Sequence, residues 1–100
     1  MRLTKYEMLP LMSFKHDQIV KQVKFHLDVG DITARTKMAT YARHLVMAIE
    51  HKHTKHSTRE IAERFGQHAS IVAHAEEVVE GKGGIPQVIL DDLNDGILML

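Results

Sequence analysis

One stretch of this chain constrains its fold more than any other: residues 57–80, which read STREIAERFGQHASIVAHAEEVVE. Ser57 and Glu60 have the Ser-x-x-Glu spacing of a capping box, in which each side chain satisfies a backbone N–H that a helix start leaves free. Gly66 follows Phe65, and glycine is the residue that most readily adopts the left-handed conformation of a tight turn. The pattern predicts two short helices joined at Gly66.

The spacing inside these two helices is that of a helix-turn-helix. Two helices that cross closely need a small residue in the first helix, a glycine in the turn and an apolar, core-facing residue in the second. Ala62, Gly66 and Val72 meet these needs, and Ile61 and Phe65 supply the buried face of the first helix. An ordinary helical hairpin within a bundle is the alternative, which the spacing leaves open.

Two further helices are predicted before this motif, because apolar side chains recur there at intervals of three and four residues. The first begins at Ser13, a residue suited to capping, and is expected to end at Gly30. Thr33 or Thr36 could cap the second, whose apolar residues are Met38, Tyr41, Ala42, Leu45, Val46 and Ile49. Since no alternating strand pattern of useful length occurs, the expected fold class is all-α, a compact helical domain.

The chain divides at a glycine-rich break. Residues 1–80 are expected to form the helix-turn-helix domain, with its motif at 57–80. Residues 81–100 begin with GKGG and continue as an acidic, apolar tail, which is expected to form a short helix from Pro86. This tail either associates with a second copy in a homodimer or folds back onto its own core.

The formal net charge is zero, but the charges are segregated. Of 13 Lys and Arg and 13 Asp and Glu in the chain, residues 76–100 hold 1 and 6, which leaves 12 and 7 for residues 1–75. A mildly basic body can attract a polyanion, and it can also attract the acidic tail of its own chain.

Several other functions are not expected from this composition. Without cysteine there is no disulfide framework or thiolate metal site, and no apolar run approaches the roughly 20 residues that span a bilayer, so we expect a cytoplasmic protein without a membrane segment. No nucleophile with its base and no catalytic carboxylate pair is recognisable, so we expect neither an enzyme nor a small-molecule substrate or cofactor. The densest histidine group, at His51, His53 and His56, lies in a lysine-flanked connection where we expect no carboxylate or thiol as a neighbour, so no metal is expected there.

If the motif binds duplex DNA, the start of its second helix enters the major groove. The expected base contacts are then Gln67, His68, Ala69, Ser70, Ala73 and His74. The expected phosphate contacts are the basic residues of the first helix and of the segments before it: Arg35, Lys37, Arg43, Lys52, Lys55, Arg59 and Arg64.

Three runs, KMATYARHL, STREIAERFG and HASIVAHAEEVV, together resemble the C-terminal duplex-DNA-binding domain of the bacterial replication initiator DnaA, a relative of the Trp repressor. The resemblance covers about residues 16–80 and implies that domain's helix-turn-helix fold and its binding of double-stranded DNA. It also implies that His68, Ala69 and Ser70 take the places of the family's base readers, with Arg35 and Lys37 near its basic loop. The initiator's ATPase domain has no counterpart in this sequence, because no GKS or GKT phosphate loop occurs.

The sequence also departs from this family. Its turn is shorter by one or two residues, Ala69 replaces a base-reading threonine, and Glu76 and Glu77 occupy positions where the family often carries Lys or Arg. The first hypothesis is a small DNA-binding protein, sequence-specific or semi-specific, that acts in replication initiation or transcription regulation and is encoded by a phage or other mobile element. The alternative is a protein-binding adaptor that keeps the fold and has lost DNA binding.

Overall fold

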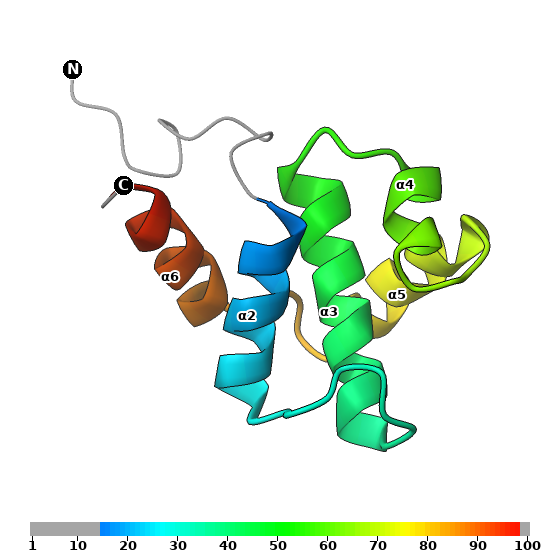
Figure 1. Cartoon of the computed structure of the whole chain (residues 1–100), viewed down its shortest axis with the longest axis horizontal. Coiled ribbons are helices and arrows are strands. Elements are labelled where there is room, and N and C mark those ends of the chain that lie inside the picture. The colour runs from blue at the N-terminus through cyan, green and yellow to red at the C-terminus, as the bar shows by residue number, and fades with distance from the viewer. Residues whose placement is uncertain (1–14, 99–100) are drawn as a thin grey trace.

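The computed structural model describes residues 15–98, and the side chains of residues 15–95. Over this range the elements are α2 (His16–Leu27), α3 (Lys37–His53), α4 (Thr58–Glu63), α5 (Ser70–Gly81) and α6 (Gln87–Leu98) (Figure 1). No strand occurs in residues 15–98, which confirms the all-α prediction.

Helix α3 is the centre of the fold. It packs against α2 on one side and against α4 and α5 on the other, as Figure 1 shows. A helix with two packed faces needs apolar side chains around most of its circumference, and residues 45–49 of α3 (LVMAI) are all buried. Leu45, Val46 and Ile49 belong to the cluster shared with α2, whereas Met47 belongs to the cluster shared with α4 and α5. The central helix therefore connects the two halves of the core.

The start and end of α2 differ from what the sequence predicts. Ser13, the expected cap, lies outside the described residues, and Lys15 is the N-cap residue of the helix. The prediction that Gly30 ends the helix is wrong, because the left-handed residue is Asp28, with φ 54° and ψ 49°. Aspartate is one of the few residues besides glycine that tolerate this conformation. The N–H of Val29 donates to the carbonyl of Lys24 at 3.0 Å and closes the helix end.

The start of α3 follows one of the two alternatives. The Oγ1 of Thr36 accepts a hydrogen bond from the backbone N–H of Ala39 at 3.1 Å, so Thr36 is the N-cap and Thr33 is not. Thr33 instead donates to the carboxylate of Asp31 from both its backbone N–H and its hydroxyl, at 2.9 and 2.6 Å. These bonds lower the pKa of Asp31.

The C-terminal segment folds back onto its own core. Helix α6 begins directly after Pro86, as predicted, and lies along α2 on the side away from α3 (Figure 1). Ile89 and Leu93 are buried in the cluster that includes α2, and the Nε2 of His26 lies 2.6 Å from Oδ2 of Asp92. Helix α6 is thus part of the packed domain. Across residues 15–98, no helix is both long and apolar enough to cross a membrane.

Candidate nucleic-acid interface

The capping box predicted at the start of the motif is present. The backbone N–H of Glu60 donates to Oγ of Ser57 at 3.1 Å, and the backbone N–H of Ser57 donates to Oε1 of Glu60 at 3.2 Å. Hydrogen bonds from Ser57 lower the pKa of the Glu60 carboxyl. A helix of six residues has few hydrogen bonds of its own, so these two bonds matter for where α4 begins.

The turn between α4 and α5 depends on Gly66. Its φ is +66°, a value that side chains with a Cβ rarely adopt. The N–H groups of Gly66 and Gln67 donate to the carbonyls of Glu63 and Ala62, both at 3.0 Å. After the turn, the N–H of Ser70 donates to Nδ1 of His68 at 3.2 Å as α5 begins.

The interior of the motif packs on α3. Ala62 and Val72 are both buried, together with Ile61 and Ala75, in the cluster that contains Met47 of α3. A small residue in α4 and a branched one in α5 thus meet at the crossing, as the spacing predicts. The arrangement is a helix-turn-helix whose two helices share a core with the central helix.

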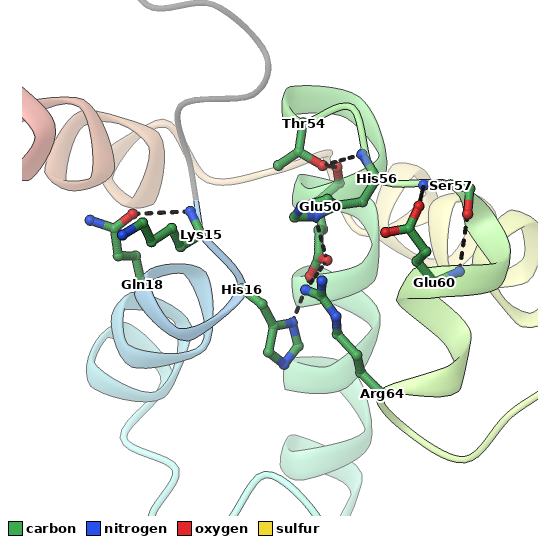
Figure 2. A network of polar contacts seen from close by, with 9 residues as sticks. All are labelled: Lys15, His16, Gln18, Glu50, Thr54, His56, Ser57, Glu60 and Arg64. Atoms are coloured by element: carbon green, nitrogen blue, oxygen red, sulfur yellow. Dashed lines mark hydrogen bonds and ion pairs between the residues drawn. The ribbon is translucent and has the colours of Figure 1, made fainter.

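A buried carboxylate connects the motif to the rest of the domain. Glu50, near the end of α3, has no exposed surface. Its Oε1 lies 2.7 Å from Nδ1 of His16, its Oε2 lies 2.8 Å from Nδ1 of His56, and Nη1 of Arg64 donates to the same Oε2 at 2.5 Å (Figure 2). The three partners belong to α2, to the segment before α4 and to the end of α4.

The charge of Glu50 is retained in spite of its burial. Burial by itself would raise the pKa of this carboxyl, but the hydrogen bond and charge of His16, the charge of Arg64 and the hydrogen bond of His56 outweigh it, and the pKa is lowered. An unpaired buried carboxylate would cost several kcal/mol, so these partners are required for the fold. Glu50 is not among the residues that the sequence patterns indicate as functional. The available signal was a glutamate directly after the apolar run LVMAI.

A second set of hydrogen bonds sets the path of the chain from α3 to α4. The hydroxyl of Thr54 donates to the backbone carbonyl of Glu50, and the N–H of His56 donates to that same hydroxyl at 3.1 Å (Figure 2). Thr54 is itself buried. These hydrogen bonds at Thr54 and His56 fix the connection between α3 and α4, and they place the ring of His56 beside Glu50.

The predicted phosphate contacts fall into two groups. Arg64 is held by Glu50, and Arg43 donates from Nη1 to the carbonyls of Ile32 and Ala34 at 2.6 and 2.9 Å, so both have structural roles. Arg59 forms an exposed pair with Glu63, at 3.0 Å. The remaining members have exposed side chains: Arg35, Lys37, Lys52 and Lys55. The role of this set in binding phosphate stays a prediction.

The predicted base contacts line the outer side of the motif. Ser70, Ala73 and His74 are exposed on α5, opposite the buried Val72 and Ala75. In the turn before α5, exposed positions are 67 and 68, and position 69 is partly buried. These residues therefore present one continuous edge to the surroundings, and their contacts with bases stay a prediction.

Glu76 and Glu77, two of the three glutamates in α5, have different surroundings. Oε1 of Glu76 lies 2.8 Å from Nδ1 of His51, so this carboxylate is paired with α3. Glu77 is exposed and lies one turn after Ala73, on the same side of the helix. The charge of Glu77 would therefore repel a phosphate that lay beside Ala73.

The histidines of the group at residues 51, 53 and 56 have different surroundings. His51 pairs with Glu76 and His56 with Glu50, so the expectation that no carboxylate lies beside this group is wrong. Burial, followed by the charge of Lys52, lowers the pKa of His53. Within the described part of the chain, no three His, Asp or Glu side chains gather as they would around a metal ion.

Comparison with known proteins gives one family. The model of the family described as the bacterial DnaA protein helix-turn-helix matches residues 16–79, which is most of the chain. The match begins at α2 and ends within α5, so it includes the buried carboxylate, its three partners and both helices of the motif. Comparisons with curated proteins and with solved structures find no match.

Proposed function

We propose that this chain, which belongs to the bacterial DnaA helix-turn-helix family, binds double-stranded DNA with the start of α5 in the major groove. The observation that carries the proposal is the exposed edge of the motif: residues 67, 68, 70, 73 and 74 are all exposed, while Ala62 and Val72 hold the two helices together beneath them. A helix-turn-helix needs this combination of a packed crossing and an uncovered second helix.

The groups on this edge set a limit on specificity. Gln67 is the one amide side chain of the predicted set and can pair with adenine, while His68, Ser70 and His74 can each make single hydrogen bonds to bases or phosphates. The methyl groups of Ala69 and Ala73 can contact the thymine methyl. With few bidentate groups, binding is expected to be sequence-specific to a modest degree.

Phosphate contacts would supply most of the affinity. Lys55 and Arg59 lie beside the capping box, and the charge of Arg59 is only partly offset by the exposed Glu63. Arg35 and Lys37 lie at the start of α3. Each phosphate contact releases condensed counterions, so the logarithm of the binding constant should fall by about 0.9 per phosphate for each tenfold rise in salt.

We further propose that the protein acts in replication initiation or transcription regulation, in the cytoplasm, and that a phage or mobile element encodes it. Two copies on one duplex would compensate for a small contact surface. A homodimer through the C-terminal segment would have to use the outer side of α6, where Val88 is 55% exposed, because Ile89 and Leu93 are buried. Light scattering with and without Val88→Glu tests this: a dimer that the substitution leaves intact places the contact elsewhere.

The central experiment is a shift assay at low salt with random-sequence and genomic duplexes. Wild-type protein, Lys55→Ala and Arg59→Ala are compared with Lys21→Ala, which changes an exposed lysine on α2. We expect both variants in the motif to weaken binding and to flatten its salt dependence, and the α2 variant to bind like wild type. Absence of any shift at low salt would refute DNA binding.

Glu77 favours a second candidate function. Its exposed charge on the outer side of α5 would repel phosphate and could instead pair with a basic protein surface, as in an adaptor that retains the fold. The variant Glu77→Lys separates the two functions. It should tighten binding to duplex DNA if DNA is the partner, and it should weaken binding to a protein partner that recognises the acidic position.

A further inference from the structure

A hollow of about 320 Å³ lies between the start of α3 and the end of α5. Three of its lining residues are cationic: Arg35, Lys37 and Lys82. Tyr41 and His44 also line it. No acidic side chain of the described residues lines it. Three positive charges around one hollow repel each other, and a bound anion would relieve that repulsion.

Lys82 is held in place at this hollow. Its Nζ lies over the ring of Tyr41, 5.4 Å from the ring centroid, an arrangement in which the aromatic face attracts the ammonium. The backbone N–H of Lys82 donates to the carbonyl of Val79 at 3.1 Å. The chain then reverses through Gly83 and Gly84, whose φ values are +99° and +88°. Lys82, the single basic residue of the acidic C-terminal segment, thus lies at the same hollow as Arg35 and Lys37 at the start of α3.

We propose that this hollow binds a phosphate group and that Lys82 is one of its ligands. The lining residues include an ammonium, a guanidinium and a phenol hydroxyl, and each of these groups can donate to a phosphate oxygen. The same chemistry is found in a phosphodiester of DNA and in free inorganic phosphate. The position of the hollow favours the DNA backbone.

That position follows from one ring contact between the wall of the hollow and α5. His44 lines the hollow, and its ring meets the ring of His74 edge to face, with 5.4 Å between centroids. His74 lies on the exposed edge of α5 that is proposed to face the bases. A duplex with its major groove on that edge brings a backbone strand toward the hollow. The choice of DNA as the source of the phosphate rests on the proposed function.

The test compares Lys82→Ala with Lys21→Ala, which removes an exposed lysine on α2. Binding to a labelled duplex is measured by fluorescence anisotropy from about 50 to 200 mM salt, and thermal unfolding confirms that each variant is folded. We expect Lys82→Ala to lose about threefold to tenfold in affinity at low salt and to lower the salt slope by about 1, the effect of one phosphate contact. Tyr41→Phe, which keeps the ring under Lys82, should lose less affinity for the duplex than Lys82→Ala does.

A second measurement uses inorganic phosphate alone. Amide resonances of residues 36, 41 and 82 are followed during titration at constant ionic strength, in wild type and in Lys82→Ala. If wild type binds DNA but Lys82→Ala has the wild-type slope, the phosphate site is refuted and the proposed function stands. If wild type binds no duplex, the proposed function fails. In that case, chemical-shift changes on addition of phosphate that are seen in wild type and lost in Lys82→Ala would assign the site to free phosphate. If phosphate causes no such changes in wild type, the phosphate site is refuted.

Discussion

Nη1 of Arg64, at the end of α4, donates to Oε2 of Glu50, whose side chain is wholly buried in α3. The arginine side chain is 32% exposed, so water reaches one partner of the pair and not the other. Removing the arginine leaves the carboxylate in the core without its permanent cation. The carboxylate cannot reach water without local unfolding, so the loss is not compensated by solvent. Loss of Arg64 therefore leaves the buried carboxylate without one of its three partners.

Arg64→Ala should therefore lower the free energy of unfolding by about 3 kcal/mol. The matched control is Arg59→Ala in α4, since Arg59 pairs with Glu63 while both side chains are largely exposed. That variant should unfold at nearly the wild-type concentration of urea. Equal losses of stability in the two variants would contradict a special role for the buried pair.

Gly66→Ala should destabilise the domain by about 1 kcal/mol, because φ at this position is +66° and alanine is strained there. No atom lies within 4 Å of an added Cβ at Gly66 or at Gly81, so steric overlap does not distinguish the two sites. Gly81 is the last residue of α5, and Gly81→Ala should be neutral or slightly stabilising. Urea unfolding of both variants is the measurement. A loss of stability in Gly66→Ala but not in Gly81→Ala would show backbone strain and not steric overlap.

Asp28→Gly should stabilise the domain by roughly 0.5 kcal/mol, because φ of 54° is strained for aspartate and favourable for glycine. Gly30→Ala serves as its control, since Gly30 has neither a positive φ nor a close neighbour for the new methyl group. If Asp28→Gly lowers the midpoint of thermal unfolding while Gly30→Ala does not, the left-handed end of α2 at residue 28 is in doubt.

The stability of the domain should depend on pH through His44. Burial, followed by the charges of His74 and Arg43, lowers the pKa of this imidazole. In the unfolded chain histidine titrates near pH 6.5, so below that pH the unfolded state binds more protons than the folded state, and folding is disfavoured. The free energy of unfolding of wild type minus that of His44→Gln should therefore decrease from about pH 7.5 to pH 5. A difference that stays constant over this range in urea titrations would contradict the prediction.

Features that depend on a few neighbouring residues could be predicted from the sequence. Ser57 and Glu60 are three positions apart and complete each other, so their capping box follows from spacing alone. Ala62, Gly66 and Val72 likewise take their places from helix geometry, and their packing confirms the predicted motif. The family match over residues 16–79 rests on the same local patterns.

Features that depend on tertiary contacts could not be predicted in this way. Glu50 is 34 residues from His16 and 14 from Arg64, and no local rule connects them. The charge of Arg43 predicts a phosphate contact, but nothing in the sequence indicates that its guanidinium donates to two carbonyls that precede α3. The identity of the left-handed residue after α2 depended on the path of the chain to α3. Which exposed residues contact DNA stays a prediction for the same reason.

The buried carboxylate also limits the transfer of the motif to other proteins. A peptide cut at residues 57–80 would contain Arg64 without Glu50, and a six-residue α4 is too short to persist by itself. The same motif grafted onto another scaffold would lack the acceptor that its arginine requires. Transfer of its recognition edge to a designed protein would have to include α3 with Glu50, so the smallest exchangeable unit is close to the whole domain.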